Sequence, residues 1–332
     1  MKGWGVKIIG TGGHLPGKPV TNQEVIDAWD LDLDPEYIEK VVGITTRHWA
    51  DEGTGTSHMA AEACKIAMER ANIKPEQLDR IILGTGTADY TSLAAAGRIQ
   101  HILGATCPAE DTVNACASFV YALDRAVRLL ATGAEYVLVA GADIKSRFLT
   151  KKDERFIPVF GDGAGAVVLS KCSTEEGFME IALWQDGYGI DKLNVPAGGS
   201  LIPPTHKTLD DGLHGTIMTI DSKEFLQRAV AVMKNLGEKV CSSYGIKPGD
   251  VDYFVMHQAN MYVMKKVAEA LEIPLEKMEV TIDIMGNSMA GTIPFTLNSV
   301  YEKRDLKPGQ TILMLTAGAG FSGGSALYVV PE

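Results

Sequence analysis

The sequence Ile73-Lys-Pro-Glu-Gln-Leu-Asp-Arg-Ile-Ile-Leu83 recurs in similar form in the second half of the chain, as Ile246-Lys-Pro-Gly-Asp-Val-Asp-Tyr-Phe-Val-Met256. Each copy is typical of a turn followed by an apolar strand. Asn114-Ala-Cys-Ala-Ser118 and Asn287-Ser-Met-Ala-Gly291 lie at the same offset from each other, and each opens a segment whose apolar residues have helical spacing. One pattern is therefore repeated along the chain.

A third repeat relates Gly133–Val139 to Gly309–Leu315. Short turn and strand patterns also recur by chance in α/β proteins, but three repeated segments in the same order favour duplication of the whole unit. We therefore predict an N-terminal half at residues 1–172 and a C-terminal half at residues 177–332.

Each half alternates strands with amphipathic helices, of which Ser57–Ala71 and Lys223–Tyr244 are the clearest. This alternation predicts an α/β fold with mostly parallel sheets covered by helices. The stretch Leu193–Leu213 is rich in Pro, Gly and Thr and has neither helical nor strand periodicity, so we expect a long loop or lid there.

The composition excludes several classes of protein. With 45% hydrophobic and 22% charged residues and a net charge of −11, the chain is typical of a soluble globular protein that does not bind nucleic acid or anionic membranes. It lacks an apolar run long enough for a membrane helix, and its N-terminus lacks the apolar core of a secretory signal, so we expect a cytoplasmic protein. Its five cysteines have neither the spacing of a zinc site nor that of a disulfide framework.

Cys116 follows a short extended run, Asp111–Asn114, and precedes a segment with one broad apolar helical face. The thiol should therefore lie at or just before a helix N-terminus, where backbone N–H groups and the helix dipole favour thiolate. A lone cysteine among apolar residues is more often part of a core. Its place between a strand and a helix makes Cys116 a candidate nucleophile.

His257 ends the predicted strand Val251–Met256, and Asn287 lies among small residues in Met285–Pro294. Polar residues just after the carboxyl end of a strand lie where open α/β sheets carry their sites. A satisfied interior histidine and a helix-capping asparagine are the plain alternatives. The duplication favours a site, because Asn287 and Cys116 occupy nearly equivalent places in the two halves.

Two other motifs have competing interpretations. The order Cys116, His257 and then an asparagine also occurs in papain-like proteases. The residues around the cysteine, Asn-Ala-Cys-Ala-Ser, differ from the sequence that surrounds the cysteine of such proteases, so we reject this interpretation. Gly318–Gly323 matches the dinucleotide motif G-x-G-x-x-G, yet another strand follows it instead of a helix. We reject a nicotinamide site and expect this hairpin to present a backbone N–H to an oxyanion.

With these residues assembled, the chain resembles the β-ketoacyl-acyl carrier protein synthase III family along nearly its whole length. The matching segments are Ala115–Ala117, Phe119–Leu123, Phe160–Leu169, His257–Asn260, Gly286-Asn287 and Gly318–Leu327. Together they are far more specific than a lone glycine motif.

The resemblance implies a thiolase fold, with two mixed sheets in a five-layer α-β-α-β-α arrangement, a homodimer, and no metal or redox cofactor. It implies decarboxylative condensation of an acyl group on Cys116 with a malonyl thioester bound by His257 and Asn287. The acylation oxyanion hole would be formed by the N–H groups of Cys116 and Ala319. Acyl and malonyl thioesters of coenzyme A or of an acyl carrier protein are the implied substrates.

Several positions depart from the family. Tyr37 and Val41 stand where a Trp and an Arg commonly flank the adenine of coenzyme A, Glu154 and Tyr262 replace arginines, and Ser92 replaces an aromatic acyl-pocket gate contributed across the dimer. We therefore expect weak binding of free coenzyme A and a starter other than acetyl, in a specialised pathway.

The remaining site expectations also follow from the resemblance. Phe160, Gln258 and Asn260 should contact substrate together with Ser92 and Tyr37. Lys265, Lys266 and Arg228 should form a basic patch that docks an acidic carrier protein. Two rival functions stay open: acyl transfer from Cys116 to an amine or alcohol without decarboxylation, and a non-catalytic partner subunit that only binds a carrier protein.

Overall fold

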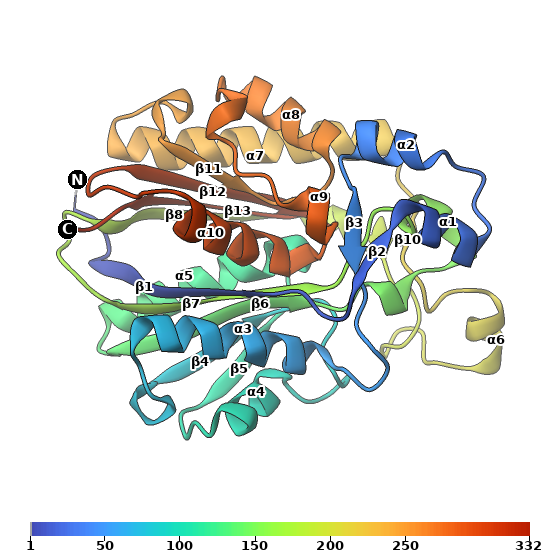
Figure 1. The fold of residues 1–332 in the computed structure, drawn as a ribbon, viewed down its shortest axis with the longest axis horizontal. Helices are drawn as coiled ribbons and strands as arrows, with labels where there is room; N and C mark the ends of the chain where they lie inside the picture. The colour runs from blue at the N-terminus through green and yellow to red at the C-terminus, as the bar shows by residue number, and fades with distance from the viewer. Residues whose placement is uncertain (1) are drawn as a thin grey trace.

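Two β-sheets alternate with three layers of helices (Figure 1), and the computed structural model describes residues 2–332. The outer layers contain α7 and α8 on one side and α3 and α4 on the other, while α5 and α10 lie between the sheets. Their bounds are α3 Thr56–Ala71, α4 Ala96–Leu103, α5 Ser118–Ala131, α7 Ser222–Tyr244, α8 Met261–Ala270 and α10 Thr292–Lys303. The expected five-layer arrangement is confirmed.

The five-stranded sheet has the order β1-β7-β6-β4-β5, and the four-stranded sheet has the order β11-β12-β13-β8. The strands are β1 Val6–His14, β4 Arg80–Gly84, β5 Ala109–Thr112, β6 Tyr136–Asp143, β7 Gly163–Lys171, β8 Gly177–Gln185, β11 Tyr253–Met256, β12 Thr311–Gly318 and β13 Ser322–Val329. The chain passes from the first sheet to the second between β7 and β8, and the division into two domains stays a prediction.

Both sheets are mixed, so the expectation of mostly parallel sheets was wrong. In the larger sheet β4 pairs in parallel with β5 and β6, while β7 pairs antiparallel with β1 and β6. In the smaller sheet β12 is parallel to β11 and antiparallel to β13. The helical crossovers set the parallel pairs, but β13 returns from β12 through a tight hairpin, which forces antiparallel pairing.

Two helices predicted from sequence, α3 and α7, end at the predicted residues and begin close to the predicted ones. Helix α3 begins one residue before the predicted Ser57, and α7 begins one residue before the predicted Lys223. Asp221 caps α7 by accepting hydrogen bonds from the backbone N–H groups of Lys223 and Glu224. Gly245 closes it in the left-handed conformation, at a φ of 84°.

The two central helices show the duplication most clearly. Each follows a short 3-10 turn, Ala115–Ala117 before α5 and Met289–Gly291 before α10. Each turn opens with a non-glycine residue of positive φ, 49° at Ala115 and 47° at Met289. Ala115 thus corresponds in the structure to Met289. The repeated sequence pattern instead aligns Ala115 with Ser288, one residue earlier. Asn287 therefore lies ahead of the position equivalent to Cys116.

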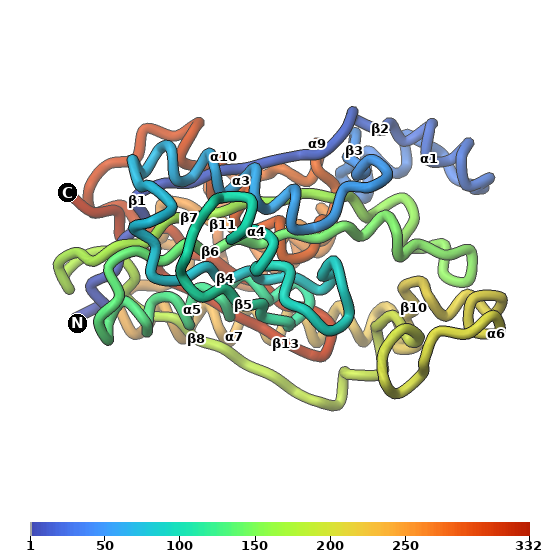
Figure 2. Tube along the Cα trace, turned by 90° about the horizontal axis from the view of Figure 1, so that it is seen from below, coloured from blue at the N-terminus to red at the C-terminus, as the bar shows by residue number. Residues whose placement is uncertain are grey.

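Most of the shorter elements, among them β2, α1, α2, α6 and β10, lie at the end of the molecule away from both termini (Figure 1). The shorter elements are β2 Pro19–Thr21, α1 Asn22–Trp29, α2 Pro35–Tyr37, β3 Thr46–His48, β9 Leu193–Asn194, α6 His206–Asp210, β10 Ile217–Met218 and α9 Ile282–Met285. The stretch expected to be a loop or lid contains β9 and α6 and extends beyond the layers (Figure 2). Strand β9 pairs with β10, which closes this excursion at its base.

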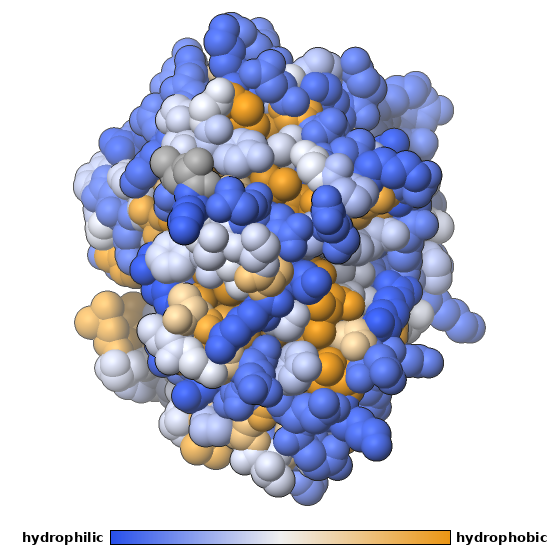
Figure 3. All heavy atoms as spheres, turned by 90° about the vertical axis from the view of Figure 1, so that its left-hand side faces the viewer, coloured by the Kyte–Doolittle hydropathy of each residue, from blue (hydrophilic) through white to orange (hydrophobic). Residues whose placement is uncertain are grey.

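The end that carries the termini presents a mainly hydrophilic surface with scattered apolar patches (Figure 3). Among residues 2–332, no helix is long and apolar enough to cross a membrane.

Candidate active site

Cys116 lies in the turn between β5 and α5 and is half-buried. The Ser118 hydroxyl holds this turn: it donates to the carbonyl of Ala115 at 2.7 Å and accepts from the N–H of Asn114 at 2.7 Å. Strand β12 approaches the turn closely, because a Cβ at Gly318 would lie 2.9 Å from the backbone nitrogen of Cys116. Glycine at this position therefore lets the C-terminal half touch the thiol's own backbone.

Burial raises the pKa of the Cys116 thiol to about 12, and the nearby Asp143 carboxylate also raises it, whereas Lys145 lowers it. The sequence suggested that a helix N-terminus would favour thiolate. Desolvation outweighs that effect here, because a buried thiolate loses its hydration. The resting thiol is therefore protonated at neutral pH, and attack on a carbonyl requires a base to accept its proton.

His257 directly follows β11 and is buried. Burial lowers the pKa of its imidazole to about 4, so the ring is neutral at physiological pH. Its Nδ1 lies 2.7 Å from the Thr292 hydroxyl, which also lies 2.9 Å from the carbonyl of Met289. When the hydroxyl donates to Nδ1, Nε2 carries the hydrogen; when it donates to Met289, Nε2 is left as an acceptor. Thr292 thus controls whether Nε2 accepts or donates a proton.

Asn287 has a fixed side chain and backbone. Its Oδ1 accepts from the N–H of Met289 at 3.0 Å, and its Nδ2 donates only a long 3.4 Å bond to the carbonyl of Ala259. Its backbone bonds to Val159 and Gly161 on either side of Phe160. With Oδ1 held by Met289 and Nδ2 only weakly bonded, the amide has N–H capacity left to donate to a ligand.

The turn before α10 contacts the turn of Cys116, so the two halves meet at this site. Asp143, at the end of β6, holds the two halves together here through hydrogen bonds to both. Its Oδ2 accepts from the N–H of Ala290 at 2.9 Å, and its Oδ1 accepts from the N–H of Gly86 and the hydroxyl of Thr87, both at 2.8 Å. Burial raises the pKa of Asp143 to about 6.

The tip of the β12–β13 hairpin also reaches this region. The Ser322 hydroxyl lies 2.8 Å from the carbonyl of Asn114, just before the turn of Cys116, and 3.1 Å from the carbonyl of Ala319. Ala319 is partly exposed at this tip. The hairpin tip is thus held beside the turn of Cys116, and the contribution of the Ala319 N–H to an oxyanion hole stays a prediction.

Comparison with known proteins places this chain in a family. The family described as 3-oxoacyl-[acyl-carrier-protein (ACP)] synthase III matches residues 111–187, and its C-terminal family matches residues 241–330. The β-ketoacyl-[acyl-carrier-protein] synthase III of Syntrophomonas wolfei is 37% identical over 324 residues, which cover 97% of this chain and 96% of the relative. The chain belongs to the β-ketoacyl-[acyl-carrier-protein] synthase III family. It is therefore a condensing enzyme, a transferase of the thiolase fold.

Two further relatives extend this result. An acetoacetyl CoA synthase of Streptomyces sp. (strain CL190) is 36% identical over 323 residues, covering 96% of each chain. The crystal structure of the synthase III of Aquifex aeolicus VF5 superposes with a TM-score of 0.88 at 33% identity and covers 98% of this chain and all 100% of that one.

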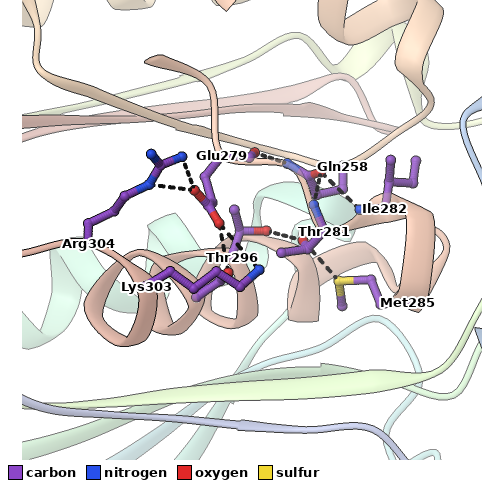
Figure 4. Close-up of polar contacts among 9 residues, drawn as sticks. Gln258, Glu279, Thr281, Ile282, Met285, Thr296, Lys303 and Arg304 are labelled. Carbon is purple, nitrogen blue, oxygen red and sulfur yellow. Dashed lines mark hydrogen bonds and ion pairs between the residues drawn. The ribbon is translucent and has the colours of Figure 1, made fainter. Parts of the chain in front are cut away.

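Gln258, expected to contact substrate in this synthase III, has an internal role instead (Figure 4). Its side-chain N–H groups donate to the carbonyls of Met256 and Glu279, and its oxygen accepts from the N–H groups of Thr281 and Ile282. All four bonding positions of the amide are used, which leaves none for a substrate. Gln258 joins β11 to the segment that leads to Asn287.

The other expected substrate contacts are dispersed. Phe160 is buried and bridges to Asn287, so it lies in the site. Asn260 caps α8, with its Oδ1 accepting from the N–H of Val263 at 2.8 Å. Tyr37 is 53% exposed on α2, and Ser92 is exposed in the connection between β4 and α4.

The expected docking residues lie on the two outer helices that pack together, α7 and α8. Lys265 and Lys266 are exposed on α8, and Lys266 pairs with Glu269 at 2.8 Å. Arg228 on α7 pairs with Glu224 at 2.9 Å and lies over the ring of Tyr188. Two of the three cations therefore already have an acidic neighbour, and a docking role stays a prediction.

The sequence interpretation missed three residues that this geometry identifies: Thr292, Asp143 and Lys145. Thr292 resembles an ordinary first residue of a helix, and its contact with His257 depends on the meeting of the two halves. Asp143 and Lys145 did carry a signal, since both follow directly from the apolar run Tyr136–Ala142, where a buried charge is unexpected.

Proposed function

We propose that Cys116 is acylated by an acyl thioester and that the acyl group is then joined to a malonyl-type thioester with loss of CO₂. The observation that supports this most strongly is the neutral, buried His257, held by Thr292 beside the turn that follows Asn287. A neutral imidazole and a primary amide are two uncharged donors, a pair suited to an enolate oxygen.

In the acylation step, the sulfur of Cys116 attacks the thioester carbonyl while His257 Nε2 accepts the thiol proton. The N–H groups of Cys116 and Ala319 would stabilise the oxyanion. When the tetrahedral intermediate collapses, the carbon–sulfur bond of the donor breaks and its thiol leaves with the proton. This step uses the tautomer of His257 in which Thr292 donates to Met289.

In the condensation step, the malonyl carbon–carbon bond breaks and CO₂ leaves, and the electron pair forms an enolate. Nε2–H of His257 and Nδ2–H of Asn287 stabilise the enolate oxygen. The enolate carbon then attacks the acyl carbonyl on Cys116, the thiolate leaves and is protonated by solvent, and a β-ketoacyl thioester is released. One such donor is typically worth about 3–4 kcal/mol.

We also propose that the working form is a homodimer. Strand β5 is at the edge of its sheet, so among residues 2–332 no strand pairs with its outer side in one copy. The adjoining Val113 and Leu93 are 69% and 68% exposed, an apolar surface that a second copy would cover. Ser92, next to Leu93, would then reach the acyl pocket of the other copy.

Substrate delivery completes the proposal. A carrier protein would dock near Lys265, the one of the three cations without an acidic partner at ion-pair distance among residues 2–332. Tyr37, Val41 and Tyr262 are exposed near the adjoining ends of α2 and α8, where free coenzyme A would lack arginine contacts and bind weakly.

The test uses the wild-type protein with a malonyl thioester labelled in its free carboxylate and a panel of acyl thioesters. We expect an acyl adduct on Cys116 by intact mass and release of labelled CO₂ that depends on this adduct. Transfer of the acyl group to an added amine or alcohol without CO₂ would instead support the rival acyltransferase. The absence of any adduct would support the non-catalytic subunit.

A further inference from the structure

Lys145 places a positive charge inside the protein beside Cys116. It follows β6 and is only 6% exposed. Its Nζ lies 5.4 Å from the ring centroids of both Phe148 and Phe160. Within residues 2–332, no carboxylate oxygen lies within 4.0 Å of this ammonium group.

The nearest acid does not serve as its contact partner. Asp143 raises the pKa of Lys145 through its charge, yet its carboxylate bonds to Thr85, Gly86, Thr87 and Ala290. Burial prevails and lowers the pKa of Lys145 to about 8, so most of the side chain is charged at neutral pH. A buried cation without an anion in contact is costly, and such groups are concentrated at functional sites.

The charge lies within reach of a group bound to Cys116. The ammonium of Lys145 lowers the pKa of the Cys116 thiol. Phe160, over which Lys145 lies, packs in the same apolar cluster as Cys116, and its backbone also pairs with that of Asn287. Lys145 is therefore placed between the acyl and the malonyl side, and the chemistry of each bound group decides which one it serves.

The carboxylate of the malonyl thioester is a poor partner for this cation. That carboxylate loses its charge as CO₂ leaves, so a cation beside it would stabilise the ground state more than the transition state and slow the reaction. An anion that keeps its charge throughout has no such conflict. The acyl chain on Cys116 is the place for one.

We propose that Lys145 binds a carboxylate at the far end of the acyl group on Cys116, so that the acyl donor is the thioester of a dicarboxylic acid. This inference rests on the proposed acylation of Cys116 and names its substrate class. The Phe148 and Phe160 rings would enclose the methylene carbons, and Lys145 would neutralise the terminal charge.

The test compares acyl groups of equal carbon number with and without the carboxylate. Succinyl and butyryl, then glutaryl and pentanoyl, are offered as pantetheine thioesters, which lack the phosphates of coenzyme A. We expect the kcat/KM for Cys116 acylation to favour the better-fitting dicarboxylic donor at least roughly tenfold in the wild type. Lys145→Met keeps the length but removes the charge and should reverse this preference. The exposed Lys239, changed to Met, should leave it unaltered.

Binding to the Cys116→Ser variant, with and without Lys145→Met, separates this inference from the proposed function. A carboxylate preference in binding that requires Lys145 would support the inference even if wild-type Cys116 were never acylated. Equal effects of Lys145→Met on all donors would mean that Lys145 only tunes the thiol, and would overturn it. A loss confined to malonyl-dependent condensation would assign the cation to the malonyl carboxylate and also overturn it.

Discussion

At the scale of single residues, Thr292 decides what His257 can do. The hydroxyl has one hydrogen and two acceptors within reach, Nδ1 of His257 at 2.7 Å and the carbonyl of Met289 at 2.9 Å. Acylation needs a free lone pair on Nε2, whereas condensation needs a hydrogen there. The same hydroxyl can support both steps by turning between its two acceptors, provided that the ring gives up its Nδ1 proton to solvent and takes one up on Nε2 between the steps.

Thr292→Val should therefore impair condensation more than acylation. Valine has nearly the same shape, but without the hydroxyl no donor keeps Nδ1 as an acceptor, so the Nε2–H tautomer that condensation needs is no longer enforced. We expect CO₂ release to fall by up to roughly a hundred- to a thousandfold, the loss typical of one oxyanion donor, while adduct formation changes little. Thr292→Ser should restore condensation. Equal losses in both steps would contradict the tautomer argument.

The same histidine should make folding sensitive to mild acid. Its pKa is about 4 in the folded protein and 6.5 ordinarily, so between these values the unfolded chain binds a proton that the folded chain does not. Stability is then complete above about pH 6.5 and falls as the pH drops toward 4, by at most about 1.4 kcal/mol per pH unit.

Urea unfolding of the wild type and of His257→Asn between pH 4.5 and 7 isolates this effect. Asp143, whose pKa burial raises to about 6, contributes with the opposite sign in both proteins and cancels in the comparison. We expect the wild type to lose more stability than the variant as the pH falls. Parallel curves would show that His257 accepts protons freely in the folded protein.

At the scale of elements, a buried acid holds the segment that leads to Asn287 (Figure 4). Glu279 is 4% exposed and accepts hydrogen bonds from Ser299 at 2.8 Å and from Arg304 at 2.9 Å, both on or next to α10. The hydroxyls of Thr281 and Thr296 lie 2.6 Å apart and join the same segment to α10. These contacts fix α9 against the central layer.

Glu279→Gln should destabilise the protein by about 1–3 kcal/mol, because a buried hydrogen bond to charged groups is weakened. Glu302 on α10 is a matched control: it pairs with Arg70 at 2.6 Å, but both side chains are more than 40% exposed. Glu302→Gln should cost about 0–1 kcal/mol. Urea unfolding measures both variants, and equal effects would show that the Glu279 contacts do not anchor the segment.

Elements with a strong local pattern were predictable from sequence, and those that depend on distant partners were not. The bounds of α3 and α7 follow from their apolar faces and caps. The antiparallel pairing of β7 with β1 joins the first and last strands of the N-terminal half, which no local pattern reveals. Within the candidate site, Cys116 and His257 were singled out because each follows a strand, and Asn287 because of its place in the duplication, whereas Gln258 looked equally available and is fully bonded internally.

At the scale of the whole molecule, Ser92 tests the proposed dimer together with the starter. Ser92 is exposed in one copy, beside the edge strand β5 and the exposed Leu93. If it lines the acyl pocket of the other copy, its small size leaves room for a longer chain. Each buried methylene contributes about 0.8 kcal/mol, so two or three would favour a longer acyl group over acetyl roughly ten- to a hundredfold.

Ser92→Phe should remove this preference, measured as kcat/KM for Cys116 acylation by acetyl and butyryl thioesters. In a mixed dimer, the Cys116→Ser copy supplies Ser92 to the only active pocket, so a Ser92→Phe partner should regain the wild-type preference. A wild-type preference for acetyl, unaltered by Ser92→Phe, would show that neighbouring side chains fill the space and that the pocket is closed.

The central claim is the division of labour between the two halves, with Cys116 from the first and His257 and Asn287 from the second. The most direct measurement combines intact mass with CO₂ release for Cys116→Ser, His257→Ala and Asn287→Ala. We expect no adduct on Cys116→Ser, an adduct on both other variants, formed more slowly on His257→Ala because the base is missing, and little CO₂ from either. An Asn287→Ala or His257→Ala protein that condenses at the wild-type rate, or a Cys116→Ser protein that still joins the two substrates, would contradict the account.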